Sequence, residues 1–374
     1  MFFDTPVTIK EFQKSFELLT PPAIAWKGDN VGLLIGREND VIRNIVVALD
    51  ATMEVAVEAV KKKANLLVTH HPLIFQPLRR ITPTSRTGEL VLFLTEHKLN
   101  LYAAHTNLDS VKWGVNYVLA KTLGLKNISI LSPIKESLTK ITVFVPHTHV
   151  ENVAEAMHNA GAGMFTKYDK CSFRGEGIGT FRGMNDANPF LGEVGKLETA
   201  KETRLEMLCE TWKLAGVISA MLKAHPYEEV AYDVYPLLNE NTEYGIGAIG
   251  DVESSMSEQK FLRHVKKKLK TPTIRYTPGK GSVRRVAVVG GSGSELIEEA
   301  LRKGADALVT ADLKYHTFQD YNKKIMLVDA GHYETEHIVL PTIAEKIKSI
   351  VTAKKSTAKV FITQQTTNSI LYYS

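Results

Sequence analysis

The chain has only two cysteines among its 374 residues, Cys171 and Cys209. They lie far apart and lack the close spacing of metal-binding cysteines, which excludes a disulfide framework and favours a reduced setting. No stretch is apolar over the length that a membrane span needs. The first residues also lack the basic and apolar segments of a signal peptide. We therefore expect a cytoplasmic protein with no membrane partner.

Neither sign of charge dominates, because 46 Lys and Arg residues stand against 41 Asp and Glu residues, for a net charge of +5. The lysine runs at 61–63 and 266–268 fall on amphipathic helical patterns, where they are expected to form solvated faces. No basic stripe with interleaved aromatic residues is present, so the charge does not favour a nucleic-acid partner. A length of 374 residues, 44% of them hydrophobic, predicts two or three domains.

Two stretches of the chain share a β-α-β pattern. In the first, the predicted strands begin at Ile45 and Leu66; in the second, they begin at Val286 and Ala307, so both pairs are 21 residues apart. Internal repeats of this kind indicate a duplicated half-domain. The alternation of strand and helix predicts an α/β layer with a largely parallel sheet in each half.

The segment between the two halves has a different pattern. Residues 133–243 read as strand, helix, strand, strand, helix and strand, which is the ferredoxin-like order. We therefore predict duplicated α/β half-domains that form one core, with an inserted ferredoxin-like α+β domain. The boundaries are 1–132 for the first half, 133–243 for the insert and 244–374 for the second half.

Histidines and carboxylates follow three of the predicted strands. The strands are 66–69, 100–103 and 325–328, and ligands bind beyond the carboxyl ends of strands in open α/β sheets. Each motif has a plain alternative: a surface histidine pair, a helix cap, or an acid that complements a helix dipole. The six residues are His70, His71, His105, Asp109, His332 and Glu336.

Together these residues predict a metal site, although each motif alone is weak. Imidazole nitrogens and carboxylate oxygens are common ligands of transition metals. Six ligands exceed the need of one four-coordinate ion, and a carboxylate can bridge two ions. We therefore expect a dinuclear centre, whose natural chemistry is hydrolysis.

The motifs resemble those of the Nif-three-like family, whose members are often labelled GTP cyclohydrolase type II homologues. The likeness is carried by His70-His71-Pro72, His105-Thr-Asn-Leu-Asp109 and Gly331-His332-Tyr-Glu-Thr-Glu336, and also by Asp29-Asn30 and the glycines after Val286. Residues 224–229 further resemble the longer bacterial members, whose middle domain is similar to PII and CutA proteins.

The resemblance implies a centre of two divalent ions, with zinc first and iron or manganese as alternatives, and a ring-shaped homohexamer. It carries all six ligand positions over to this chain, with Glu336 as the expected bridge. It also implies a GTP cyclohydrolase-like activity.

A second set of residues could assist the chemistry. Asp312, Lys314 and His316 follow the strand 307–310 and could supply an acid or base or contact a phosphate; a helix cap at Asp312 is the alternative. Glycines 290–293 could bind an anion, but they lack a P-loop lysine and a tight turn is favoured. In the insert, His225, Tyr227 and Glu228 could bind a ligand, and a structural role is preferred.

Two functions follow from these features. The first is a metal-dependent hydrolase that acts on a nucleotide or another small substrate, with Glu336, His316 and Asp312 as the predicted catalytic residues. The second is a regulatory or metal-handling hexamer that uses the PII-like insert to bind a ligand or a partner.

Overall fold

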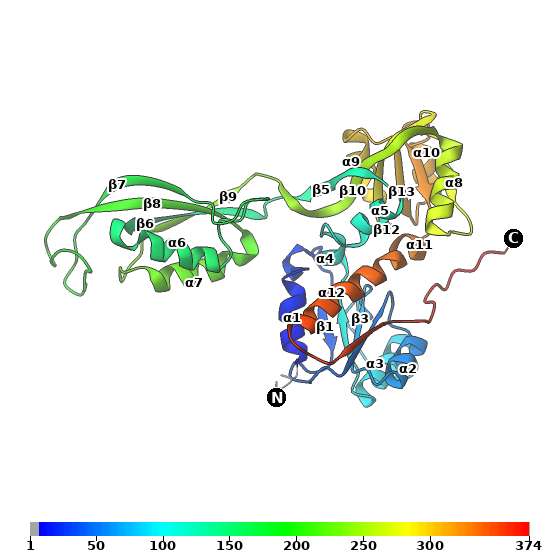
Figure 1. Ribbon diagram of the computed structural model, residues 1–374, viewed down its shortest axis with the longest axis horizontal. Coiled ribbons are helices and arrows are strands. Elements are labelled where there is room, and N and C mark those ends of the chain that lie inside the picture. The colour runs from blue at the N-terminus through cyan, green and yellow to red at the C-terminus, as the bar shows by residue number, and fades with distance from the viewer. Residues whose placement is uncertain (1–6, 374) are drawn as a thin grey trace. The chain divides into compact units, whose positions relative to one another are not determined.

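The computed structural model describes residues 7–373 and divides the chain into two compact units. The core unit comprises residues 1–132 and 244–374, and the middle unit comprises residues 133–243. The protein has a mixed α/β fold with three sheets (Figure 1). Within the described part of the chain, every helix is too short or too polar to cross a membrane.

The first sheet of the core unit has five strands in the order β1-β4-β3-β2-β15. Its strands are β1 (Gly32–Ile35), β2 (Asn44–Ala48), β3 (Leu66–Thr69), β4 (Asn100–Ala103) and β15 (Lys359–Ile362). All neighbours are parallel except β1, which runs antiparallel to β4. Strands β3 and β4 are buried along their whole length, which explains their continuous apolar sequences.

The second sheet of the core unit has six strands in the order β11-β14-β13-β12-β10-β5. Its strands are β5 (Lys126–Ile134), β10 (Asn241–Ser257), β11 (Arg275–Thr277), β12 (Ser282–Ser292), β13 (Ala307–Ala311) and β14 (Met326–Asp329). Strands β12, β13 and β14 are parallel, whereas β10 and β11 are antiparallel to their neighbours. The largely parallel sheet predicted for each half therefore describes the first sheet, and the second is mixed.

Helices cover the two sheets of the core unit. They are α1 (Ile9–Glu17), α2 (Met53–Lys61), α3 (Arg86–Glu96), α4 (Thr106–Asp109), α5 (Val115–Thr122), α8 (Glu258–Leu269), α9 (Ile297–Arg302), α10 (Tyr315–Asp320), α11 (His332–Glu336) and α12 (Leu340–Ala353), with 3-10 turns at Pro22–Ile24, Ser294–Leu296 and His337–Val339. Polar caps begin several of them; the Thr52 side chain, for example, accepts from Val55 N at the start of α2.

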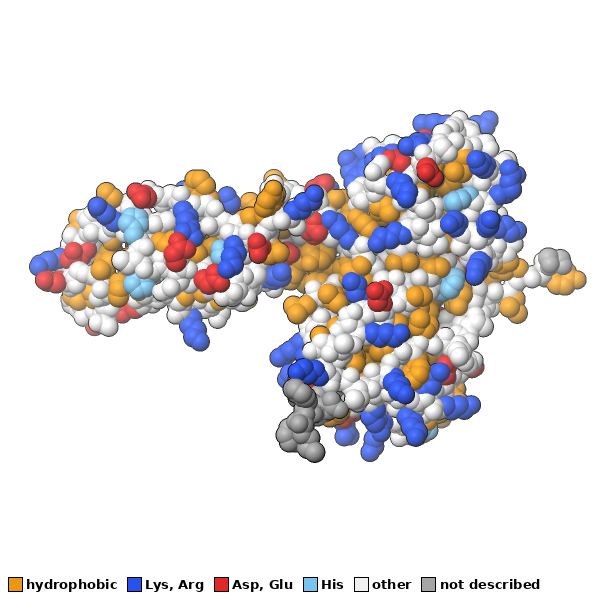
Figure 2. All heavy atoms as spheres, in the orientation of Figure 1, with side chains coloured by type: hydrophobic (Ala, Val, Ile, Leu, Met, Phe, Trp, Pro, Cys, Tyr) orange, Lys and Arg blue, Asp and Glu red, His pale blue; other side chains and the backbone are white. Residues whose placement is uncertain are grey.

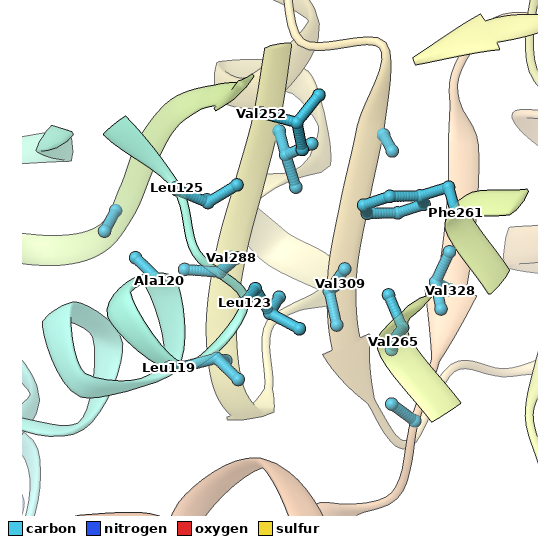
Figure 3. Close-up of a cluster of buried hydrophobic side chains, with 14 of the residues drawn as sticks. Leu119, Ala120, Leu123, Leu125, Val252, Phe261, Val265, Val288, Val309 and Val328 are labelled. Carbon is cyan, nitrogen blue, oxygen red and sulfur yellow. The ribbon is translucent and has the colours of Figure 1, made fainter. Parts of the chain in front are cut away.

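Apolar side chains from helices α5 and α8 pack against the second sheet. Figure 3 shows Leu119 of α5 and Phe261 of α8 in one cluster with the valines of β12, β13 and β14. Phe261 is fully buried there. This packing holds the carboxyl ends of the parallel strands in place, because close-packed interiors resist displacement.

The middle unit has one antiparallel sheet in the order β7-β8-β6-β9. In chain order its elements are β6 (Leu138–Pro146), α6 (Val150–Asn159), β7 (Phe173–Phe181), β8 (Glu198–Glu210), α7 (Leu214–Ala224) and β9 (Tyr232–Leu237), with 3-10 turns at His147–His149 and Thr211–Lys213. Apolar residues of α6 and α7 share a core with the sheet. On the face that Figure 2 shows, Lys and Arg side chains are dispersed among uncharged and acidic groups.

Candidate metal centre

The predicted ligands stand just beyond the carboxyl ends of β3, β4 and β14. His70 and His71 follow β3, His105 precedes the first residue of α4, and His332 is the first residue of α11. The ring centroid of His71 lies 4.9 Å from that of His70, 5.6 Å from that of His105 and 5.3 Å from that of His332. The core unit therefore brings all four imidazoles, from both halves of the sequence, to one place.

The Nδ1 atom of each imidazole forms a hydrogen bond with an oxygen atom. The pairs are His71 with Asp50 Oδ1 at 2.7 Å, His105 with Asp29 Oδ1 at 2.9 Å, His332 with Asp312 Oδ2 at 2.6 Å and His70 with the Ala104 carbonyl at 2.9 Å. Carboxylates and carbonyls can only accept, so each Nδ1 donates, and in the neutral imidazole each Nε2 is left as the acceptor. This arrangement is typical of histidines that bind metals, because it sets both the tautomer and the ring orientation.

Three buried atoms of the cluster make no hydrogen bond of good geometry. They are His70 Nε2, Asp109 Oδ1 and Glu336 Oε2. Buried polar atoms without partners are rare in folded proteins because their desolvation is not compensated. His70 Nε2 and Asp109 Oδ1 lie 3.7 Å apart. A cation between His70 Nε2 and Asp109 Oδ1 would satisfy both atoms, so these residues fit a metal site.

The two oxygens of Glu336 face different imidazoles. Oε1 lies 3.8 Å from His70 Nε2, whereas Oε2 lies 3.0 Å from His71 Nε2 and 3.2 Å from His332 Nε2. Two sets of ligand atoms in the described chain are close enough to hold an ion: one of His70, His71 and His105, and one of His71, His332 and Glu336. One ring nitrogen binds a single ion, so His71 belongs to one site or the other.

The pKa values of several side chains in the cluster are shifted, because these groups are buried and lie close together. Burial raises the pKa of the Asp109 carboxyl to about 6, against the opposing effect of His70. Burial lowers the pKa of His71 and His332, but hydrogen bonds to carboxylates outweigh it and raise these values to about 10 and about 9. Burial likewise opposes the change at Asp29, yet hydrogen bonds from His105 and Thr106 lower its pKa.

A glycine makes room for the Glu336 carboxylate. Gly291, at the end of β12, has a φ of +61° and is buried. A Cβ atom at this position would lie 2.3 Å from Glu336 Oε1 and 3.0 Å from His332 Nε2. Its Thr335 neighbour accepts a hydrogen bond from Gly291 N at 3.0 Å. The glycine-rich turn therefore leaves space for two of the predicted ligands, beyond the tight turn that its sequence predicts.

A cavity of about 460 Å³ opens beside the cluster. His105, Asp109, His332 and Glu336 contribute to its wall. The rest of its wall includes Trp26, Lys27, Phe75, Gln76, Ile246, Ser292 and Glu295. The lining therefore combines aromatic side chains and a lysine with the ligand atoms, which allows a small polar molecule with a flat ring to approach them.

The second set of predicted residues is divided in the structure, because Asp312 contacts a predicted ligand and His316 contacts Gln319. Asp312 orients His332 from a left-handed backbone position with φ of +57°, and Lys314 is the N-cap of α10. His316 is exposed, and its Nδ1 lies 3.2 Å from Gln319 Oε1. It is therefore not brought to the ligand cluster, which also contains Asp50, a residue that we did not predict from the sequence.

The candidate residues of the middle unit contact one another and the sheet. His225 Nε2 lies 3.0 Å from the Phe144 carbonyl, and the Tyr227 hydroxyl donates to Glu202 Oε1 at 2.9 Å. Glu228 Oε1 accepts from Asn188 N at 2.8 Å. Burial lowers the pKa of His225. These contacts suit the structural role that the sequence favours.

Comparison with known proteins agrees with the ligand motifs. A model of the Duf34/NIF3 (NGG1p interacting factor 3) family matches residues 7–369. The chain belongs to this family. It is 42% identical to a protein of Halalkalibacterium halodurans over 92% of this chain and 93% of that one, and 41% identical to a Bacillus subtilis protein over 94% and 95%. Both are named GTP cyclohydrolase 1 type 2 homolog.

Two solved structures share the fold over nearly the whole chain. A Bacillus cereus protein related to NIF3 superposes with a TM-score of 0.87 at 38% identity, covering 99% of this chain and 100% of that one. A Staphylococcus aureus protein superposes with a TM-score of 0.80 at 29% identity, covering 98% and 99%. The resemblance stated from the sequence motifs is therefore confirmed.

Proposed function

We propose that this Duf34/NIF3 chain holds two divalent metal ions and is a metal-dependent hydrolase acting on a nucleotide or another small substrate. The observation that carries the proposal is the convergence of four Nε2 atoms, each with its Nδ1 in a hydrogen bond, on the buried carboxylate of Glu336 and the half-buried carboxylate of Asp109. Zinc is the first choice of metal, with iron or manganese as alternatives, because imidazole and carboxylate ligands accept all three.

The six predicted ligands would hold the ions, with Glu336 between them. Its two oxygens face different histidines, which is the arrangement a bridging carboxylate needs. Asp50, Asp29 and Asp312 would keep the imidazoles oriented. Bound metal ions of this kind lower the pKa of water and polarise a substrate oxygen.

The cavity residues suit a nucleotide-like substrate. Trp26 and Phe75 are both exposed in the lining, and aromatic faces of this kind can stack on a flat base. Lys27 lies beside Trp26 and can attract an anionic group. Asp312 is exposed and accepts from His332 Nδ1, so it can pass a proton between that ring and solvent. A catalytic role for His316 stays a prediction, since its contacts lie elsewhere.

Elemental analysis tests the metal centre. Wild type, Glu336→Ala and His97→Ala would be purified without added metal and also after reconstitution. His97 is an exposed histidine that contacts Phe93 at the end of α3, so it controls for histidine loss alone. We expect about two ions per chain in wild type and His97→Ala and a loss in Glu336→Ala. A wild type without stoichiometric metal, even after reconstitution, would refute the centre.

Turnover tests the hydrolase. Metal-loaded wild type and Glu336→Ala would be assayed against a broad panel of nucleotides and amides. We expect hydrolysis of at least one nucleotide by the wild type and none by the variant. If the metal-loaded wild type hydrolyses nothing in the panel, the hydrolase is refuted and the metal centre stands alone.

The middle unit supports a second candidate, a regulatory or metal-handling hexamer. Its β-α-β-β-α-β order motivates the proposal that it is an inserted PII/CutA-like domain with boundaries at 133 and 243, between two duplicated α/β halves. Domains of that class commonly bind ligands. The candidate predicts a ligand or partner that still binds after the six ligands are replaced and is lost when 133–243 is removed. The hexamer and the cytoplasmic location stay predictions.

A further inference from the structure

The C-terminal segment, residues 363–373, has no helix or strand but is held to the first sheet at its start. It follows β15, and Thr363 N donates to the Val47 carbonyl of β2 at 2.9 Å. The Thr363 hydroxyl donates to Glu58 Oε2 at 2.5 Å, and Gln364 N donates to Glu58 Oε1 at 3.1 Å. Glu58 is buried on α2. These contacts direct the segment past the end of β2 toward the ligand cluster; in Figure 1 it is the dark red trace that leads to the C label.

At Thr367, the segment reaches Asp50, whose carboxylate contacts the predicted ligand His71. The Thr367 hydroxyl donates to Asp50 Oδ2 at 2.6 Å, while Asp50 Oδ1 accepts from His71 Nδ1 at 2.7 Å. The next residue, Asn368, donates from Nδ2 to Glu334 Oε1 at 3.2 Å. Glu334 lies on α11, the helix that carries His332 and Glu336. The segment therefore contacts Asp50, the partner of His71, and also the helix that carries His332 and Glu336. None of these contacts is to a predicted ligand.

We propose that Thr367 is a positioning residue of the metal centre, acting on His71 through Asp50. An aspartate has one torsion that turns its carboxylate, and each oxygen of Asp50 has a different partner. The Thr367 hydroxyl holds Oδ2, which leaves Oδ1 aimed at the imidazole. Such outer partners set the orientation and basicity of a metal-bound histidine. The inference rests on the proposed metal centre and adds the C-terminal segment to it.

The size of the expected effect follows from the exposure of Asp50. Its side chain is 32% exposed, so water can replace the lost hydroxyl in part and the variant is expected to fold. Loss of a group that touches the ligand itself typically weakens metal binding about 10–100-fold. Thr367 stands one hydrogen bond further out, so we expect metal binding about three- to tenfold weaker.

The chain offers a matched control on the same segment. Thr363 is also a half-buried threonine whose hydroxyl donates to a carboxylate, but Glu58 contacts no predicted ligand. Thr367→Val and Thr363→Val therefore make the same chemical change at two ends of one segment. Thr367→Ser keeps the hydroxyl and is expected to restore binding.

Zinc affinity, measured in the full-length protein by competition with a chromophoric chelator, tests the inference. The visible spectrum of the Co²⁺-loaded protein adds a direct report on ligand geometry. We expect Thr367→Val to weaken zinc binding about three- to tenfold and to change the spectrum. Thr363→Val and Thr367→Ser should match wild type in both. Unfolding temperatures of the two valine variants show whether either effect comes from lost stability.

Three outcomes would overturn the inference. One is Thr367→Val with wild-type affinity and spectrum while wild type binds zinc, in which case the metal centre stands and only the role of Thr367 fails. Another is an equal loss in both valine variants, because a loss shared by both sites would reflect the segment's general stability. The third is a wild type that binds no zinc, which refutes the proposed centre and this inference with it.

Discussion

Replacing Gly291 with alanine should displace the bridging carboxylate. The residue is buried at the end of β12 with a φ of +61°, and an added Cβ would lie 2.3 Å from Glu336 Oε1. The nearest atom belongs to a side chain, so Glu336 can move aside without unfolding the strand. That movement takes the carboxylate out of the position between His70 and His71.

The substitution should lower both folding stability and metal affinity, and the same substitution at a second glycine distinguishes the two effects. Alanine in the left-handed region costs about 1–2 kcal/mol of folding stability wherever it is introduced. Gly304 has a similar φ of +72°, but a Cβ there would meet nothing within 4 Å. Gly304→Ala should therefore carry the backbone cost alone. Gly291→Ala should carry that cost and also lose metal affinity by at least about tenfold, since a ligand is displaced.

Two measurements on both variants separate these effects. Denaturant unfolding of the metal-free proteins gives the stability cost, which should be similar in the two. Zinc competition with a chelator gives the affinity, which should fall only in Gly291→Ala. If Gly291→Ala binds zinc as tightly as Gly304→Ala, Glu336 is not a ligand and the reasoning about the bridge is wrong.

Three further predictions follow from the site. Adding zinc to metal-free wild type should raise its unfolding temperature, by stabilisation of about 2.7 kcal/mol at 100 times the dissociation constant, and should leave Glu336→Ala unchanged in calorimetry. The pKa values of His71 and His332 are about 10 and about 9 without metal, so metal binding should release their protons. The apparent metal affinity should therefore rise with pH. In titration calorimetry, the binding enthalpy should depend on the ionisation enthalpy of the buffer. Asp312→Asn should weaken zinc binding about 10–100-fold by chelator competition, whereas Asp320→Asn on exposed α10 should not.

The clustering of the predicted ligands could be anticipated from the sequence because each motif is local. A buried strand, a histidine and a short helix follow one another within a few residues at 100–109 and 326–336, and the structure keeps that order. The spacing of four between His332 and Glu336 places both side chains on one face of α11, where their atoms approach to 3.2 Å. The strand pairs also match: Ile45 aligns with Leu66, and Val286 aligns with Ala307.

The groups that orient the ligands were harder to predict because they depend on distant parts of the chain. Asp29 meets His105 across 76 residues, and Thr367 meets Asp50 across 317. Strand β15 was not predicted, since its four residues gain their place only by pairing with β2. Asp50 itself carries a local signal, because it follows a buried strand that ends at the same edge of the sheet as His70.

The two sheets of the core unit share a strand pairing, Ile45 with Leu66 and Val286 with Ala307, but they contribute unequally to the site. The ends of β4 and β14 are alike, since each supplies a histidine and a carboxylate. The end of β3 supplies His70 and His71, whereas the corresponding end of β13 supplies Asp312, which orients a ligand. The end of β2 supplies Asp50, and the corresponding end of β12 supplies Gly291, which leaves space for Glu336. The cavity beside the cluster is lined from both sides, by Trp26 and Phe75 before the middle unit and by Ser292 and Glu295 after it, so a bound molecule would contact both parts of the core unit.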